Sequence, residues 1–147
     1  MKYFKFRFFT KVLLTGLIIA LTLTLNSCST TKAGFLISSV VPAAKGDVKV
    51  KKDGNDNYSI NIDITDLAEP NRLLPPKLAY IVWLESSNSV VKNIGQIKTS
   101  TSLLSSKLKA SFESVSTFRP SKIFITAEDD INVQYPVGIM VLTTNNF

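Results

Sequence analysis

The sequence has no histidine and a single cysteine, Cys28, among its 147 residues. Without histidine, the chain lacks the commonest general base and the commonest metal ligand. One cysteine excludes an internal disulfide and a cysteine-based metal cluster. These absences rule out serine–histidine triads, cysteine–histidine dyads and ordinary zinc hydrolase sites, and no pair of carboxylates stands out by its spacing. We therefore expect no enzyme, no metal site and no cofactor.

Acidic residues are missing from the first eleven positions, which hold the four basic residues Lys2, Lys5, Arg7 and Lys11. The formal net charge of +6 depends on these four, because the other 13 basic residues face 11 acidic ones. The small remaining charge is scattered along the chain, unlike the basic patch or stripe of a protein that binds nucleic acid. We expect no nucleic-acid partner.

An uncharged run of 14 residues extends from Val12 to Leu25. In a helix this run spans about 21 Å. The hydrocarbon core of a bilayer is about 30 Å thick, so the run predicts the apolar region of a signal peptide rather than a permanent span. The segment Leu25-Asn26-Ser27-Cys28 that ends it resembles a bacterial lipobox. The resemblance implies a lipidation site at Cys28, with signal cleavage between Ser27 and Cys28 after the thiol has received a diacylglycerol.

Two alternatives remain for this segment: a plain secretory peptide with a stray cysteine, or an uncleaved N-terminal anchor. A lipid that carries two or more acyl chains anchors a protein stably. Ser29 follows the cysteine, where an aspartate would resemble an inner-membrane retention signal, and Ser29–Lys32 lacks the acids that resemble a surface-export signal. The resemblance therefore implies a bacterial lipoprotein of the outer membrane that faces the periplasm. The predicted organisation is a signal peptide (1–27), a lipidated tether (28–34) and one domain (35–147).

The remainder of the chain alternates apolar and polar residues with a period of two, which predicts β-strands. Tyr58–Ile64 shows the alternation most clearly, and Leu78–Leu84 is apolar on both faces, as a central strand should be. Asp53-Gly54-Asn55 predicts a hairpin turn. A calcium loop is the alternative there, although Tyr58 and Ile64 stand where an EF-hand needs glycine and an acid.

No stretch carries the apolar stripe of an amphipathic helix. Short strands separated by turn signals indicate an all-β, antiparallel sandwich of seven to eight strands. The eight candidate strands are 35–41, 48–51, 58–65, 78–84, 90–97, 104–113, 123–127 and 137–143.

Three segments are similar to the extracytoplasmic C-terminal domain of anti-sigma-K factors. They are Tyr80–Leu84, Asn93–Gly95 and Phe124–Glu128, with Pro136 and Gly138 beyond. The similarity covers roughly residues 78–142 and implies an immunoglobulin-like sandwich. Anti-sigma activity is not expected, because that family also has a cytoplasmic sigma-binding segment and a membrane-spanning helix.

Trp83 is the only tryptophan and lies on the most apolar predicted strand. Large aromatic side chains commonly dominate small cores, so a buried anchor is favoured over an exposed aromatic platform for a ligand. Lysines form outward basic rows that either touch anionic lipid headgroups or protect strand edges from pairing. These rows comprise Lys49, Lys51, Lys52, Lys107 and Lys109.

If every strand is antiparallel to the one before it, successive loops alternate between two ends of the domain. Loops 54–57, 86–89 and 116–120 are then expected beside the tether, and loops 42–46, 66–77, 99–102 and 129–136 at the other end. Function concentrates on loops held by a rigid scaffold. We therefore expect a protein partner to contact the second end, through Arg72 and the acids Glu128, Asp129 and Asp130. The predicted function is a non-enzymatic, lipid-anchored envelope protein that binds a periplasmic protein or serves structurally; the alternative is a small-ligand or glycan-binding module.

Overall fold

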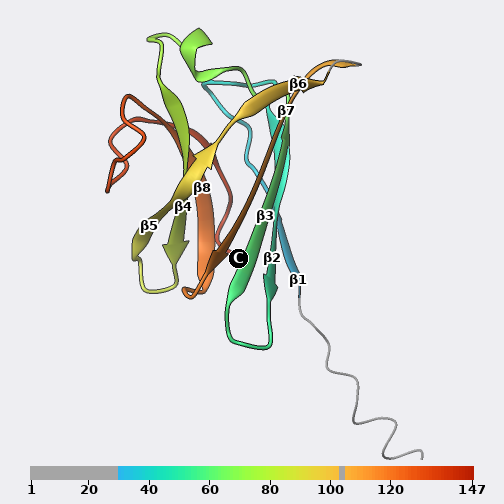
Figure 1. The fold of residues 1–147 in the computed structure, drawn as a ribbon, viewed down its shortest axis with the longest axis vertical. Coiled ribbons are helices and arrows are strands. Elements are labelled where there is room, and N and C mark those ends of the chain that lie inside the picture. Colours follow the sequence, from blue (N-terminus) through green and yellow to red (C-terminus); the bar gives the residue numbers. More distant parts are fainter. Residues whose placement is uncertain (1–29, 103–104) are drawn as a thin grey trace, which may run out of the picture.

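The computed structural model describes residues 30–102 and 105–147, without the side chains of residues 101–107. The predicted signal peptide 1–27, the cleavage and lipidation site at Ser27 and Cys28, and the Lys107 side chain lie outside the described residues. The described chain forms two antiparallel sheets that pack as a sandwich (Figure 1), which confirms the predicted all-β, immunoglobulin-like class. The strands are β1 (Thr30–Gly34), β2 (Lys45–Lys52), β3 (Tyr58–Thr65), β4 (Ala79–Ser86), β5 (Val91–Ile97), β6 (Thr99–Ser102), β7 (Ser105–Ser116), β8 (Pro120–Glu128) and β9 (Ile139–Thr143), with a 3-10 turn η1 (Pro70–Arg72).

The first strand corrects the predicted tether. Thr30–Gly34 pairs along its whole length with β2, so only Ser29 separates Cys28 from the sheet. The predicted strand 35–41 is wrong: Phe35 makes one bridge to Thr144, and the chain then leaves the sheet. The Phe35 N–H donates to Gly46 O (3.0 Å) in one sheet, and the Leu36 N–H donates to Thr143 O (2.8 Å) in the other. This segment therefore joins the edges of both sheets.

The five-stranded sheet has the order β1-β2-β3-β7-β6, and the four-stranded sheet has the order β5-β4-β8-β9. Strand β4 lies between β5 and β8, which confirms the prediction of a central strand for Leu78–Leu84. The predicted loop 99–102 is wrong, because these residues form β6, which pairs with β7. The described chain thus has nine strands rather than seven or eight.

Strand β4 is buried on both faces because it lies between two apolar clusters. Its side chains at Tyr80, Val82 and Leu84 point into the main core between the sheets. Successive side chains alternate between faces, so Trp83 points to the outer face, where it packs in a second, smaller cluster with Ala79, Ile81 and Phe124. Because this cluster lies on the outer face of the sheet, another segment of the chain must shield it from solvent.

Gly95 marks the place where β5 approaches the opposite sheet. Its φ of 138° suits glycine, and a Cβ there would lie 2.9 Å from the ring of Phe112 on β7. The β4–β5 register shifts beside it, between Val82 and Trp83. The glycine in the predicted strand 90–97 therefore permits a bulge and close packing of the two sheets.

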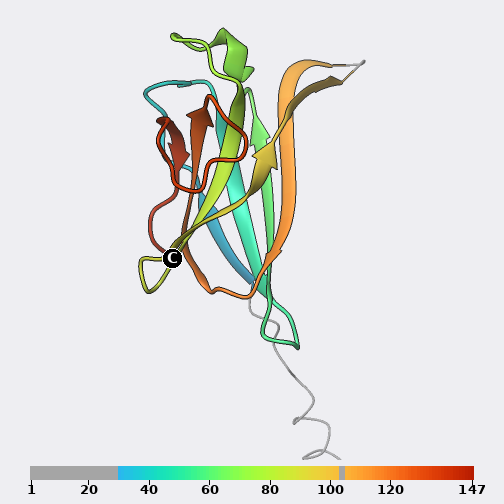
Figure 2. The same ribbon diagram turned by 60° about the vertical axis from the view of Figure 1, so that its left-hand side comes forward.

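The loops gather at two opposite ends, as the alternation argument predicted (Figures 1 and 2). Thr30 pairs with Lys51 beside the β2–β3 hairpin, and Tyr58 pairs with Ser116 beside the β7–β8 loop. We call this end, with loops 53–57, 87–90 and 117–119, the near end. We call the opposite end, with loops 35–44, 66–78 and 129–138, the far end.

The β2–β3 connection is a hairpin turn, as predicted. Asp53 Oδ1 accepts hydrogen bonds from the backbone N–H of Asn55 (2.8 Å) and Asn57 (2.9 Å). These bonds hold the pKa of the Asp53 carboxyl below its usual value. The carboxylate therefore shapes the turn itself, an arrangement typical of an Asx turn.

The outward basic rows are present where side chains are described. Lys49 and Lys51 are exposed on β2, and Lys109 is exposed on β7. Lys49 lies 3.9 Å from Asp47 and 3.7 Å from Asp63, so acids on the same face offset part of its charge. Exposed ion pairs of this kind contribute little to stability.

Candidate functional site at the far end

The loop of residues 66–78 is pinned to the sandwich by buried side chains. Leu67 is fully buried and Leu73 is 6% exposed, on either side of η1. The Tyr80 hydroxyl on β4 donates a 2.8 Å hydrogen bond to Ala68 O. A loop fixed at three points presents its exposed residues in a defined arrangement.

Tyr80 gives this attachment a measurable pH dependence. Burial raises the pKa of the Tyr80 hydroxyl from its ordinary 10.0 to about 12. The fold favours the neutral hydroxyl, so the contribution of Tyr80 is complete below pH 10 and is lost as the pH rises from 10 to 12.

We expect Tyr80→Phe to lower the free energy of unfolding by about 1 kcal/mol near neutral pH, since it removes one hydrogen bond. Phenylalanine has no proton to lose, so the difference in free energy of unfolding should change by up to about 2–3 kcal/mol in total as the pH rises past 10 toward 12 and beyond, first narrowing and then reversing. Urea unfolding of both proteins over a pH series measures the difference. If the difference in free energy of unfolding between the two proteins stays constant over the pH series, the raised pKa of Tyr80 is contradicted.

The loop of residues 129–138 covers the outer cluster of the four-stranded sheet. Val133 packs against that cluster, and Val133 O accepts a 3.0 Å hydrogen bond from Asn93 Nδ2 on β5. Trp83 is consequently 0% exposed, which confirms a buried anchor and excludes the aromatic platform. Its ring stacks on Phe124 at a centroid distance of 6.3 Å.

Glu128 is the largest departure from the predicted site. The carboxyl is fully buried under the same loop, so the prediction that it contacts a partner is wrong. Its Oε1 accepts hydrogen bonds from the Thr126 hydroxyl (2.6 Å) and from the Val137 N–H (3.2 Å), while Oε2 has no partner among the described residues. A Cβ at Gly138 would clash with Glu128 Oε2 and Ala127 O, so the loop closes over the carboxyl only with glycine there.

A buried chain of hydrogen bonds connects this carboxyl to the tryptophan. Trp83 Nε1 donates to Thr126 Oγ1 at 2.7 Å, and the Thr126 hydroxyl donates to Glu128. The outer cluster therefore contains a polar network in which Glu128 Oε2 is left without a partner among the described residues, and Glu128 holds the covering loop through the Val137 N–H. Glu128 is the first of three consecutive acids, a pattern that does not predict burial, although alternation along β8 places it on the same face as Phe124 and Thr126.

The two far-end loops are joined directly. Lys77 Nζ lies 2.6 Å from Asp129 Oδ2, and the Leu78 N–H donates to Glu128 O at 2.9 Å. Arg72 pairs instead with Glu69 in its own loop (3.2 Å). Arg72, Asp129 and Asp130 therefore share the far end as predicted, but the cation that meets the acids is Lys77.

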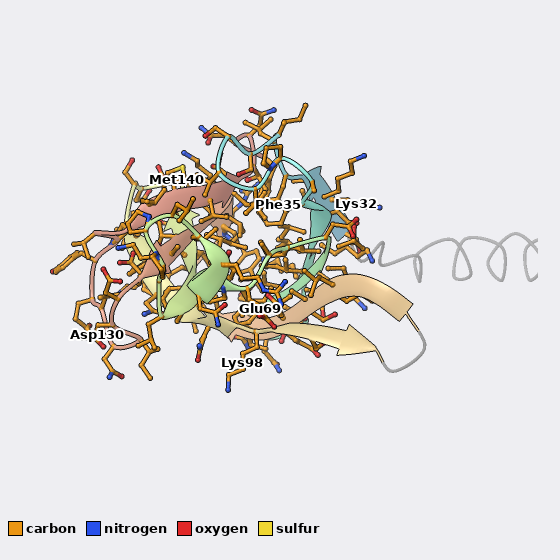
Figure 3. All side chains as sticks on the ribbon, turned by 90° about the horizontal axis from the view of Figure 1, so that it is seen from above. Lys32, Phe35, Glu69, Lys98, Asp130 and Met140 are labelled. Carbon is orange, nitrogen blue, oxygen red and sulfur yellow. The ribbon has the colours of Figure 1, made fainter. Side chains whose placement is uncertain are left out.

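Exposed apolar side chains collect on these two loops. Leu74 is 94% exposed and Tyr135 is 75% exposed. Figure 3 views this end from above, with Glu69 near the centre and Asp130 and Met140 towards one side. We call the set the far-end apolar patch: Leu74, Leu78, Ile131, Tyr135 and Val137.

A groove of about 590 Å³ runs beside this patch. Its lining includes segment 39–43, Leu73 and Leu74, and Ile139 of β9. Arg72 and Asp66 are its charged lining residues. Its volume and its mainly apolar lining are both typical of small-molecule sites.

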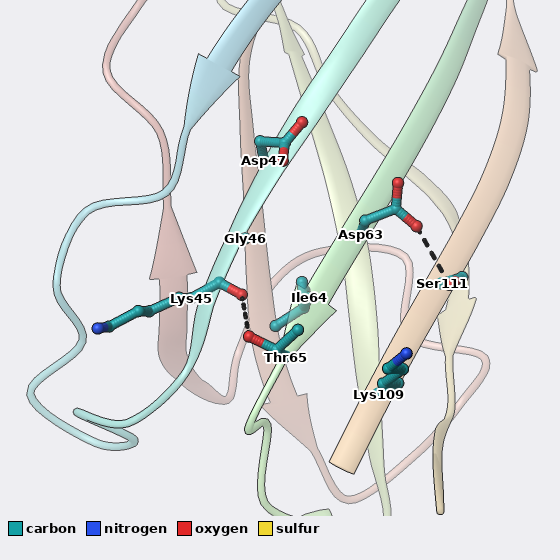
Figure 4. A pocket seen from close by; sticks show the side chains of 8 residues that line it. All are labelled: Lys45, Gly46, Asp47, Asp63, Ile64, Thr65, Lys109 and Ser111. Atoms are coloured by element: carbon teal, nitrogen blue, oxygen red, sulfur yellow. Dashed lines mark hydrogen bonds between the residues drawn. The ribbon is translucent and has the colours of Figure 1, made fainter. Parts of the chain in front are cut away.

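A second hollow, of about 460 Å³, lies on the outer face of the five-stranded sheet (Figure 4). A Cβ at Gly46 would lie 2.3 Å from Asp63 O, so glycine lets β2 and β3 approach closely there. Asp63 accepts a 3.2 Å hydrogen bond from the Ser111 hydroxyl. The ion pairs of Asp47 and Asp63 with nearby lysines offset most of its charge. This hollow has the chemistry of a solvated sheet face.

Within residues 30–102 and 105–147, no group of three acidic, histidine or cysteine side chains is arranged to hold a metal ion. The same residues include no helix that is both long and apolar enough to cross a membrane. No family model, no curated protein and no solved structure matches the chain.

Proposed function

We propose that this protein is a lipid-anchored, non-enzymatic component of the bacterial cell envelope that binds a protein partner through its far end. The lipobox-like segment supports an anchor at Cys28, and Ser29 after it supports the outer membrane, facing the periplasm. The observation that carries the proposal is that the two ends of the sandwich differ. Its first strand begins at the near end, and the apolar patch lies on loops at the opposite end.

The separation of the two ends fits this role. Strand β2 runs from one end to the other in eight residues, a length of about 25 Å at roughly 3.4 Å per residue. A protein held at Thr30 would present Leu74 and Tyr135 well clear of lipid headgroups. Apolar side chains grouped on loops and rimmed by charged residues are typical of protein interaction sites.

The far-end groove favours the alternative, a small-ligand or glycan-binding module. Glycan sites usually offer several exposed aromatic rings. In the part of the chain described here, the exposed aromatic residues are Tyr135 and Phe118, which lie at opposite ends. A protein partner is therefore the favoured occupant.

The test combines an anchor variant with crosslinking in native membranes. Cys28→Ser should abolish lipid labelling and leave an uncleaved or soluble form. In the otherwise unchanged protein, a photocrosslinking residue at Leu74 or Val137 should capture one discrete protein, and the same residue at Glu113, on the outer face of β7, should not. Tyr135→Asp should reduce the capture without shifting Trp83 fluorescence.

Lipid labelling that survives Cys28→Ser would contradict the anchor. Crosslinks from Glu113 alone would contradict the far-end surface. A small molecule captured at Leu74 in place of a protein would favour the alternative.

A further inference from the structure

We propose that the near end of the sandwich rests directly on an anionic lipid surface, with Phe118, Lys92 and Arg119 in contact with the headgroups. The inference rests on the proposed acylation of Cys28 and adds an orientation to it. The domain would then have a fixed orientation on the bilayer instead of moving freely on a flexible tether.

The length of chain between the anchor and the sheet supports this seating. Cys28 lies two residues before Thr30, where β1 begins. Two residues reach at most about 7 Å when fully extended. A lipid attached at Cys28 therefore holds the near end within about one headgroup layer of the bilayer.

With the adjoining strand ends included, the near end carries more basic than acidic residues. Lys51 pairs in register with Thr30, Lys92 lies at the start of β5, and Arg119 precedes β8. None of these three forms a salt bridge with any described residue, and all three are exposed. Juxtamembrane bases of this kind are attracted to anionic lipids.

The acids at this end are Glu85 on β4, which lies 3.9 Å from Lys122, and the two aspartates of the β2–β3 hairpin. Asp56 pairs with Lys52 at 2.5 Å, and Asp53 is held by the hairpin's own N–H groups. Loops 87–90 and 117–119 contain no acid. The uncompensated positive charge is therefore concentrated beside Phe118.

Apolar side chains accompany these bases. Phe118 is 43% exposed and Val90 is 41% exposed, at the tips of neighbouring loops. The Lys92 ammonium lies 5.2 Å from the centroid of the Phe118 ring. An aromatic ring together with a long basic side chain suits the interfacial layer, where the ring enters the acyl boundary and the ammonium stays among headgroups.

The test uses the full, processed protein in vesicles. Acylation consumes the only native thiol, so a cysteine introduced by Phe118→Cys or by Asn71→Cys is labelled alone with an environment-sensitive fluorophore. Asn71 is exposed in η1 at the far end and serves as the matched control. The vesicles contain phosphatidylcholine, with or without phosphatidylglycerol as a minor component.

We expect a blue shift and quenching by headgroup-labelled lipid for the probe at Phe118 in the anionic vesicles, and neither effect for the probe at Asn71. The pair Lys92→Glu and Arg119→Glu should abolish both effects. The charge-matched pair Lys45→Glu and Lys98→Glu, at the far end, should leave them unchanged. Emission of Trp83 in the unlabelled variants checks that they are folded.

A probe at Phe118 that is as accessible to an aqueous quencher as the probe at Asn71, on protein whose mass shows acylation, overturns this inference alone. Equal effects in neutral vesicles overturn the role of anionic lipid. A mass without acyl chains overturns the proposed anchor, and this inference with it.

Discussion

Replacing Trp83 with alanine should lower the free energy of unfolding by about 3–5 kcal/mol, the usual range for truncating a large buried aromatic side chain. The indole is fully buried, stacks on Phe124 and donates a hydrogen bond to Thr126. Its removal leaves a cavity beneath the loop of residues 129–138. That loop should therefore become accessible to proteases before the rest of the domain.

Denaturant unfolding followed by circular dichroism measures this loss, because the variant has no tryptophan left. Tyr135→Ala is the control: it removes an aromatic side chain that is 75% exposed, and it should change stability by no more than about 0.5 kcal/mol. In the unchanged protein, Trp83 emission should be blue-shifted and resistant to aqueous quenchers. Similar stability of Trp83→Ala and Tyr135→Ala would show that the outer cluster does not stabilise the fold.

Glu128→Ala should lower the free energy of unfolding by about 2–4 kcal/mol, because it creates a cavity and leaves two donors without an acceptor. The donors are the buried Thr126 hydroxyl and the part-buried Val137 N–H. Loss of the Val137 bond should release the covering loop, with increased hydrogen exchange confined to residues 129–138.

The variant Glu128→Gln distinguishes the contribution of the hydrogen bonds to stability from that of the charge. The amide oxygen can replace Oε1 as the acceptor, and the amide nitrogen takes the place of Oε2, which has no partner among the described residues. Because the acceptor and the side-chain volume are kept, we expect this variant to lose much less stability than Glu128→Ala. If Glu128→Gln is as destabilised as Glu128→Ala, the charge itself holds the loop.

The sequence predicted most strands because inward positions alternate with outward ones. In β3, Ile60, Ile62 and Ile64 are buried, as the alternation requires. In β4, apolar residues on both faces predicted a central strand, and the second buried face is the outer cluster. Period-two patterns therefore identify strands wherever a face is covered.

The strands that were missed are short and lie at sheet edges. Strand β1 has the sequence TTKAG and contributes backbone hydrogen bonds rather than buried side chains, so its residues carry no apolar pattern. Strand β6, Thr99–Ser102, is also an edge strand of polar residues. Segment 35–41 is as apolar as a strand, which is why a strand was predicted there. Its Val41 packs in the core although the segment itself is irregular.

The far-end site was predictable in place but not in detail. The alternation of successive loops between two ends placed loops 66–77 and 129–136 together, because it depends only on antiparallel strand order. It could not show that Glu128 is enclosed, because that depends on the path of residues 129–138 and on Gly138. It also could not choose Lys77 over Arg72 as the partner of Asp129, a choice made by loop geometry.

The pairing of β1 determines how the domain would carry a mechanical load. Tension between a lipid at Cys28 and a partner at the far end would act along β1, whose hydrogen bonds to β2 lie perpendicular to the strand. Such a pull shears the whole ladder at once instead of opening it bond by bond. The links from Phe35 to Gly46 and from Leu36 to Thr143 would spread the same force over both sheets. The edge strand that replaces a tether would therefore act as a force-bearing clamp between the anchor and the sandwich.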